Sequence, residues 1–381
     1  MTLIRPADMP KTILIVIGTR PEAIKLFPVI HALQRQSGVR LSICVTGQHG
    51  QLVADILAMA GITPDWDLAA LQPGQSLDAL LARLVPALGK VMDDVRPDWV
   101  LVHGDTLSAL AGALAAHFRG IRIAHVEAGL RSGDLWAPTP EEAIRKMLAA
   151  LAECHFAPTP TAAAALRAEN VGPQAIYVTG NTGIDALLST RAYVQTAPHV
   201  LAAVDALLQP FAGRRLMAVT VHRRENQGGP LANIAAGLAH LAARPDLALV
   251  YPLHPNPDIR RVMRAQLGQC PNVALIDPLD YPSFVALLDR VDLVLTDSGG
   301  IQEEAPSLGK PVLVVRDRTE RPEGLAAGTA LLVGTQSAHI VAAVTQLLED
   351  AQAYAQMARA HNPYGDGKAA NQIARILVHD S

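Results

Sequence analysis

Short apolar runs rich in β-branched residues alternate with longer amphipathic stretches along the whole chain. Such runs, bounded by turn residues, are typical of parallel strands whose two faces are covered by helices. We therefore expect an α/β fold with doubly wound parallel sheets. In the first half, the expected strands are Thr12–Ile17, Leu41–Thr46, Trp99–His103, Arg122–Val126, His155–Ala157 and Ala175–Val178. The expected helices include Pro21–Arg35, Ser76–Val95, Thr106–Phe118 and Glu141–Ala152.

The strand pattern starts again after the segment Gly180–Gly213, which mixes turn residues with a modest helix. This restart indicates a second sheet, and 381 residues are many for a single domain. We expect one domain over residues 1–180 and a second over residues 181–366. The strands expected in the second are Leu216–Val221, Leu247–Tyr251, Val273–Ile276, Leu293–Thr296 and Val312–Val315.

Composition and charge narrow the class of ligand and the compartment. The chain is 50% hydrophobic and 18% charged, with a formal net charge of −3 and no long run of one sign. Neither a nucleic-acid surface nor a polybasic membrane patch is indicated, so a small anionic ligand fits better. Cys44, Cys154 and Cys270 lie far apart in sequence, which suits a reducing compartment. The apolar run Ile13–Ile17 is too short for a signal peptide or a membrane span, so we expect a soluble cytoplasmic protein.

The first expected strand turns directly into a helix through the segment Gly18–Ala23. Gly18 eases the turn, and Pro21 suits a first helical position. The N–H groups at such a helix start attract an anion, Arg20 offers a forked donor, and Lys25 lies one turn further on. The alternative is a plain strand-to-helix turn without a ligand.

Two further strands end in carboxylates, at the edge where parallel sheets bind their ligands. Asp105 follows one of these strands and Glu127 follows the next. Asp105 stands before Thr106, so its alternative role is that of a helix N-cap. Glu127 lies at the edge of a core and needs a partner, for which Arg131 is one candidate.

More ionisable side chains gather at a helix start and at strand ends of the second half. Glu141, Glu142 and Arg145 stand within one helical turn. Acids in a first turn often serve only as partners of the helix dipole, which is the alternative here. His222 and His254 each follow a strand and should therefore lie at the edge of the second sheet.

The segment Thr296–Glu304 runs from a strand into a helix with a Gly-Gly pair at the turn. Ser298 and the N–H groups of Gly299 and Gly300 can hold phosphate oxygens, as in a diphosphate-binding nest. Glu304, one turn further on, can accept hydrogen bonds from ribose hydroxyls. The alternative is a glycine turn with no ligand.

The motifs of several large enzyme classes are missing. The chain has no GxSxG, no Walker GxxxxGK[ST] and no early GxGxxG with a downstream ribose-binding acid, which disfavours serine hydrolases, P-loop enzymes and nicotinamide enzymes. His103 and Asp105 can together ligate a metal, but zinc spacing such as HExxH is absent. The cations Arg20, Lys25 and Arg223 favour an anion pocket instead. A nucleotide-sugar site remains.

Several long motifs, taken in chain order, resemble one known family. They are GTRPEAIK at Gly18–Lys25, TGQH at Thr46–His49, HGDT at His103–Thr106, HVEAGLRSGD at His125–Asp134, PTPEE at Pro138–Glu142, HRREN at His222–Asn226, the long segment Thr296–Glu323 and HNPYGDG at His361–Gly367. Between Lys11 and Ile376 the chain resembles the non-hydrolysing UDP-N-acetylglucosamine 2-epimerases.

This resemblance implies a fold, an assembly and a reaction. The fold is a GT-B-like pair of Rossmann-like domains with the active site in the cleft between them, and a C-terminal helix, about residues 367–381, returns to the first domain. The assembly is a homodimer. The enzyme is an isomerase that converts UDP-N-acetylglucosamine to UDP-N-acetylmannosamine without a metal or another cofactor.

The chemistry explains why a family of this kind needs such residues. The C2 proton of the sugar is not next to a carbonyl, so its direct removal is prohibitively hard. Departure of UDP from C1 acidifies C2–H and gives 2-acetamidoglucal, and re-addition of UDP gives the epimer. Carboxylates near C1 and C2 and cations on the diphosphate are required. By resemblance, the catalytic residues are Asp105, Glu127, Glu141, Arg145 and His222, and the UDP-sugar contacts are Arg20, Lys25, Phe284, Ser298, Gly299, Gly300, Glu304 and Arg321.

Two positions depart from the family pattern. Ile144 replaces an Asn beside the catalytic cluster, and Leu279 replaces a Gln of the uracil region. Ile144 is the motive for considering a different substrate, of the UDP-diacetamido-uronic acid type. A GT-B glycosyltransferase, a hydrolysing relative and an inactive UDP-sugar sensor are also compatible with these motifs. In family members activated by a second substrate molecule, Gln48, Gln51 and His254 match the allosteric site.

Overall fold

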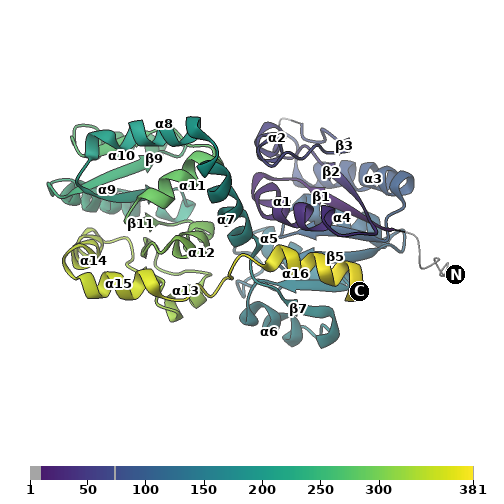
Figure 1. The fold of residues 1–381 in the computed structure, drawn as a ribbon. Helices are drawn as coiled ribbons and strands as arrows, with labels where there is room; N and C mark the ends of the chain where they lie inside the picture. Colours follow the sequence, from purple (N-terminus) through teal and green to yellow (C-terminus); the bar gives the residue numbers. More distant parts are fainter. Residues whose placement is uncertain (1–9, 73, 381) are drawn as a thin grey trace. The chain divides into compact units, whose positions relative to one another are not determined.

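The computed structural model describes residues 10–72 and 74–380. The chain forms two compact units (Figure 1). The first runs to Ala186 and takes up the chain again at Gly365, and the second is Leu187–Tyr364. Helix α7 (Thr182–Gln195) starts in the first unit and ends in the second. These points lie within a few residues of the boundaries expected from the sequence.

The first unit is built on a seven-stranded parallel sheet of order β3-β2-β1-β4-β5-β6-β7. Its strands are β1 (Lys11–Ile17), β2 (Val39–Val45), β3 (Trp66–Asp67), β4 (Trp99–His103), β5 (Arg122–Val126), β6 (Cys154–Ala157) and β7 (Ile176–Val178). Its other helices are α1 (Arg20–Gln34), α2 (Gly50–Met59), α3 (Leu77–Val95), α4 (Leu107–His117), α5 (Glu141–Leu151), α6 (Pro160–Ala168) and α16 (Ala369–Arg375). Every residue from Ile13 to Ile17 is at most 1% exposed, because helices cover both faces of the sheet.

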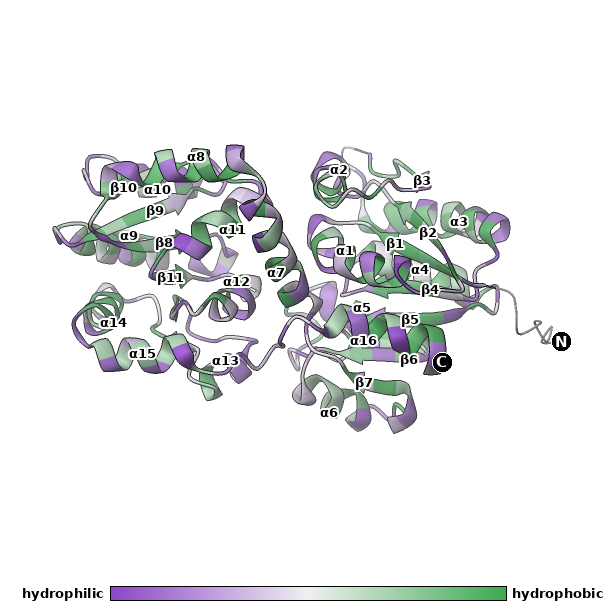
Figure 2. Ribbon diagram, in the orientation of Figure 1, coloured by the Kyte–Doolittle hydropathy of each residue, from purple (hydrophilic) through white to green (hydrophobic). Residues whose placement is uncertain are grey.

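The second unit repeats this design with a six-stranded parallel sheet of order β10-β9-β8-β11-β12-β13. Its strands are β8 (Arg215–Thr220), β9 (Leu247–Pro252), β10 (Val273–Ile276), β11 (Leu293–Thr296), β12 (Val312–Val314) and β13 (Ala330–Leu332). Its helices are α8 (Pro198–Leu208), α9 (Gly229–Leu241), α10 (Pro257–Leu267), α11 (Tyr281–Arg290), α12 (Gly299–Glu304), α13 (Pro322–Ala326), α14 (Ser337–Glu349) and α15 (Ala351–Arg359). In Figure 2 the central strands are coloured mainly as hydrophobic, as expected for strands buried on both faces.

Both sheets reverse their strand order at one point, and this point locates the ligand edge. The reversal falls between β1 and β4 in the first unit and between β8 and β11 in the second. Open parallel sheets bind ligands in the crevice beyond the carboxyl ends of the strands at such a switch point. The segments that follow these strands are therefore the places where a ligand is expected.

The strands expected from the sequence are confirmed, most of them to within one residue. Two short strands, β3 and β13, are additional to those expected. The segment Gly180–Gly213 also holds more helix than expected, because α7 and α8 fill most of it.

The C-terminal helix α16 belongs to the first unit, where it packs against α1. Arg35 Nη2 donates to Asn371 Oδ1 at 3.2 Å, and Ala370 N donates to Asp185 Oδ1 at 3.0 Å. The last helix of the chain thus packs in the same unit as its first helix. In the part of the chain that the structure describes, no helix is both long and apolar enough to cross a membrane.

Candidate active site

The turn from β1 into α1 is held by the carboxylate of Glu22. Thr19 and Glu22 form a capping box, and Glu22 Oε2 accepts hydrogen bonds from the N–H groups of Gly18 and Thr19 at 2.7 and 2.6 Å. A Cβ at Gly18 would lie only 2.1 Å from Ser108 Oγ, at the start of α4. The turns after β1 and β4 therefore touch, and only glycine fits at their contact.

Replacing Gly18 with alanine should lower the free energy of unfolding by about 3 kcal/mol, because the added methyl group overpacks a closed contact. Urea unfolding measures the loss. Gly229→Ala is the matched control, because a Cβ there has nothing within 4 Å. Adding Ser108→Gly to Gly18→Ala should recover part of the stability. Equal stability of Gly18→Ala and Gly229→Ala would contradict the contact.

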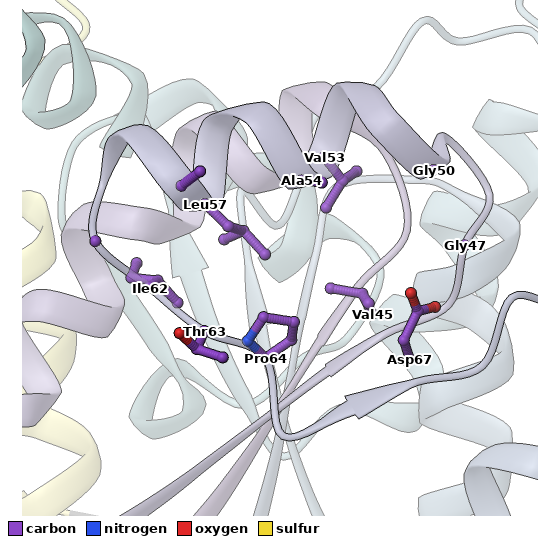
Figure 3. Close-up of a pocket in the computed structure, with 12 residues that line it drawn as sticks. Val45, Gly47, Gly50, Val53, Ala54, Leu57, Ile62, Thr63, Pro64 and Asp67 are labelled. Atoms are coloured by element: carbon purple, nitrogen blue, oxygen red, sulfur yellow. The ribbon is translucent and has the colours of Figure 1, made fainter.

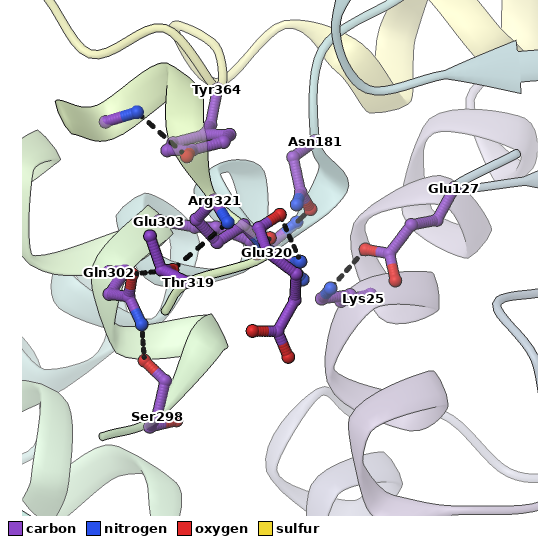
Figure 4. A network of polar contacts seen from close by, with 12 residues as sticks. Lys25, Glu127, Asn181, Ser298, Gln302, Glu303, Thr319, Glu320, Arg321 and Tyr364 are labelled. Carbon is purple, nitrogen blue, oxygen red and sulfur yellow. Dashed lines mark hydrogen bonds and ion pairs between the residues drawn. The ribbon is translucent and has the colours of Figure 1, made fainter. Parts of the chain in front are cut away.

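Glu127 leaves the end of β5 beside two basic side chains. Its Oε2 forms an ion pair with Lys25 Nζ (Figure 4) and lies 3.9 Å from His103 Nε2. Burial lowers the pKa of His103 to about 4, which the charge of Glu127 opposes. Glu127 also has a φ of 63°, a costly conformation for a residue with a side chain, and such strain concentrates at functional sites.

Asp105 follows β4 and pairs with Arg145 from α5. Arg145 Nη1 donates to Asp105 Oδ2 at 2.7 Å. The second acid on Arg145 is Glu142, which is fully buried and accepts from Nε at 2.9 Å. Burial raises the pKa of Asp105, and the guanidinium of Arg145 opposes this rise. Thr106, not Asp105, caps α4, since its side chain accepts from Ala109 N.

Two sequence interpretations in this region are wrong. Arg131 does not serve Glu127. It forms a double ion pair with Glu169 at 2.9 and 2.6 Å, a residue that lies far along the chain and is invisible to local spacing. Ile144 is 2% exposed and belongs to a hydrophobic cluster of the core, so the modified-sugar substrate loses its motive.

Glu141 remains as the least constrained acid of this edge. It is the first residue of α5, and its Oε2 is buried without a hydrogen bond from the described residues. An acceptor held in this way is available to a ligand.

In the second unit, buried Asp297 shapes the turn that follows β8. Its Oδ2 accepts from the N–H groups of His222 and Arg223 at 2.9 and 2.8 Å and from Asn226 Nδ2 at 2.9 Å. Its Oδ1 lies 3.2 Å from His222 Nδ1. Burial lowers the pKa of His222, and the charge of Asp297 opposes this shift. The contact with the Asp297 carboxylate also holds the imidazole in place.

Two guanidinium groups flank the Gly-Gly turn that follows β11. A Cβ at Gly299 would lie 3.6 Å from Nη2 of both Arg223 and Arg321. Arg321 is itself paired with buried Glu303, and Arg223 Nη2 lies 3.2 Å from Glu320. Figure 4 shows Arg321, Glu303 and Glu320 together with Ser298. Two cations beside the N–H groups of a helix start suit a diphosphate.

The remaining predicted UDP contacts surround this turn. Ser298 is the N-cap of α12, and its carbonyl accepts from Gln302 Nε2 at 3.2 Å. Glu304 Oε1 lies 3.9 Å from a Cβ placed on Gly300. Phe284 and Leu279 both pack, partly buried, against one apolar cluster of the unit. A flat base can meet an apolar surface of this kind.

The residues predicted for an allosteric site are divided between the two units of the chain. Gln48 accepts from Ser108 Oγ at 2.8 Å and Gln51 donates to Asp55 at 2.7 Å, both in the first unit. His254 lies in the second unit, where its ring stacks on His222 at 5.7 Å between centroids. The structure thus groups His254 with a predicted catalytic residue.

Two cavities adjoin α2 in the first unit, with volumes of about 410 and 420 Å³. The apolar walls of the first are shown in Figure 3 and include Val45, Val53, Leu57, Ile62 and Pro64. The second is lined by Gln48, His49, Gln51, Asp67 and Leu71, among others. Neither contains a predicted catalytic residue, and the second holds two of the predicted allosteric residues.

Sequence reasoning misses the full role of three residues. The sequence indicates only that Glu142 is an acid at the start of a helix. In the structure it accepts a hydrogen bond from Arg145 Nε. The sequence gives Arg223 as a cation of an anion pocket, and the structure places it beside the Gly-Gly turn that follows β11. Glu22 carries a signal that could have found it, because the pattern Thr19-x-x-Glu22 is typical of a capping box.

The two edges differ in the chemistry that they can perform. The first offers carboxylates next to Lys25 and Arg145, a set suited to moving a proton beside a developing positive charge. The second offers cations and N–H groups for an anionic leaving group. Among the described residues, no group of three or more His, Cys, Asp or Glu side chains could hold a metal ion.

Comparison with known proteins identifies the family of this chain. The family model described as UDP-N-acetylglucosamine 2-epimerase matches residues 31–378. The UDP-N-acetylglucosamine 2-epimerase of Escherichia coli K12 is 48% identical over 372 residues, which are 97% of this chain and 98% of that protein. The crystal structure of the Neisseria meningitidis UDP-GlcNAc 2-epimerase bound to UDP-GlcNAc has a TM-score of 0.89 and 42% identity, covering 96% of this chain and 99% of that one. The chain belongs to the UDP-N-acetylglucosamine 2-epimerase family.

Proposed function

We propose that this chain interconverts UDP-N-acetylglucosamine and UDP-N-acetylmannosamine by elimination and re-addition of UDP. The observation that carries the proposal is the pair of carboxylates at neighbouring strand ends, Asp105 and Glu127, each bound to a cation of its own. A glycosyltransferase, which shares the fold, has no need of such a set around C1 and C2 of the donor sugar.

The reaction has two halves. In the first, the bond between C1 and the diphosphate oxygen breaks, the C2 proton passes to a carboxylate, and a C1–C2 double bond forms. In the second, the diphosphate oxygen bonds to C1 again while a proton is delivered to the opposite face of C2. Asp105, Glu127 and Glu141 supply the carboxylates of these steps.

The cations and the nest serve the leaving group. Arg223, Arg321, Ser298 and the N–H groups of the Gly-Gly turn bind the diphosphate, and His222 stabilises its developing charge. Arg20 and Lys25 complete the set on the first unit. Glu304 binds the ribose, and Phe284 lies near the uracil.

The test is exchange at C2. Incubation of the purified protein with UDP-N-acetylglucosamine in deuterated water should place deuterium at C2 of both epimers, as seen by NMR and mass spectrometry. UDP-glucose, which lacks the acetamido group, is the control substrate and should stay unchanged. Recovery of both N-acetylated sugars without deuterium would refute epimerisation by this route.

Two finer points belong to the same proposal. The enzyme is a homodimer, which light scattering in solution tests. Gln48 and Gln51 contribute to an allosteric site for a second UDP-sugar at the cavity beside α2. Activation by added UDP-N-acetylglucosamine in the direction from UDP-N-acetylmannosamine tests this second point.

A further inference from the structure

Glu22 is a buried carboxylate to which the proposed reaction gives no role. It is 1% exposed and accepts three short hydrogen bonds. Its Oε2 takes the N–H groups of Gly18 and Thr19, and its Oε1 takes the hydroxyl of Thr106 at 2.6 Å. A capping box needs only the first helix, so the bond to Thr106 is an addition that joins two helices.

The two turns that Glu22 joins carry residues of the proposed site. Arg20 directly follows Thr19 in the first turn, and Asp105 directly precedes Thr106 in the second. Thr106 Oγ1 also accepts from Ala109 N at 3.1 Å, so the same hydroxyl fixes the start of α4. One carboxylate therefore sets the backbone on both sides of the switch point between β1 and β4.

The surrounding packing leaves these turns little freedom. Ser108 Oγ lies 2.8 Å from Thr46 Oγ1 and donates to Gln48 Oε1 at 2.8 Å, which ties in the turn after β2. Gly18, Thr19 and Thr106 all donate to Glu22, which favours its ionised form, although burial raises its pKa to about 7. Burying a carboxylate in this way is costly, so a role beyond local capping is indicated.

We propose that Glu22 is a positioning residue that holds the Arg20 turn and the Asp105 turn in one geometry, and that turnover depends on it more than substrate binding does. The inference rests on the proposed function. Misplacing a catalytic group by about 1 Å can cost on the order of 100-fold in rate. Binding is affected less because most of the proposed diphosphate contacts, namely Arg223, Arg321, Ser298 and the Gly-Gly turn, lie on the second unit.

Glu22→Gln tests the proposal, since it keeps the shape but replaces one acceptor oxygen with a donor. We expect kcat to fall by about 10- to 100-fold while KM stays within about threefold of the wild-type value. Both constants are measured with UDP-N-acetylglucosamine, together with C2 deuterium exchange and thermal unfolding. A rise in KM at unchanged kcat, or wild-type values of both, would overturn the proposal.

Variants of Thr106 test the same bridge from its other end. Thr106→Ser keeps the hydroxyl and should stay within about twofold of the wild-type kcat, whereas Thr106→Val should lose about 10-fold. The double variant Glu22→Gln/Thr106→Val should be no slower than the slower single variant, because both changes break one bridge. If Glu22→Gln does not fold, equal kcat values of the Ser and Val variants overturn the proposal. A wild-type protein without C2 exchange would instead refute the proposed function.

Discussion

Replacing Glu127 with glutamine should lower kcat on the order of 1,000-fold, the scale of a lost general acid or base. Glutamine keeps the shape of the side chain but cannot take or return a proton. In the proposed reaction Glu127 does this work, and its positive φ at the end of β5 and its ion pair with Lys25 fix its position. KM should change only a few fold, because the diphosphate contacts remain. Steady-state kinetics and C2 deuterium exchange measure the effect.

Glu169→Gln is the matched control for this variant. Glu169 is also an ion-paired glutamate of the first unit, but its partners are Arg131 and Lys146. Its kcat should stay within about twofold of the wild type, because the proposed reaction gives no role to Glu169, Arg131 or Lys146. Partly exposed ion pairs also contribute little to the free energy of unfolding. A Glu127→Gln enzyme that keeps a tenth of the wild-type kcat would remove Glu127 from the proton-transfer steps. Accumulation of 2-acetamidoglucal and UDP would show that only the second half-reaction needs it.

The fold can be predicted from the sequence because each central strand is an apolar run with sharp ends. β4, β5, β10 and β11 match the expected ranges to the residue. The two strands that the pattern misses have no such signal. β3 contains only Trp66 and Asp67, just after Pro64, and β13 is a three-residue edge strand with Leu331 exposed. Both form because they pair with the preceding strand, β2 or β12, and this pairing leaves no pattern within so short a segment.

The candidate site can be predicted only as far as strand ends reveal it. Asp105, Glu127 and His222 each follow an apolar run, and the parallel sheets bring such positions to one edge of each unit. Ion pairs and hydrogen bonds between segments that are far apart in sequence are not predictable. Glu169 binds Arg131 across 38 residues, and Thr106 binds Glu22 across 84. Long-range pairs of this kind are set by helix packing, which leaves no local pattern.

Arg145→Met should be the most destabilising change among the site residues. Arg145 is bound to Asp105 and to Glu142, and Glu142 is 0% exposed. Removing the guanidinium leaves a buried carboxylate without its cation, which costs about 3–5 kcal/mol of unfolding free energy. Urea unfolding measures this loss. Arg131→Met is the control, and it should cost about 1 kcal/mol or less because Glu169 is partly exposed.

A second substitution separates the stability effect of Arg145 from its catalytic effect. Arg145→Met/Glu142→Met replaces a buried ion pair with apolar groups and should regain most of the stability. Its kcat should remain low, because Asp105 still lacks the cation that opposes the rise of its pKa. Asp105 is then protonated at a higher pH than in the wild type. The acidic limb of the pH–activity profile should therefore shift to higher pH, and raising the pH should restore part of the activity. Full recovery of kcat in the double variant would mean that Arg145 serves stability alone.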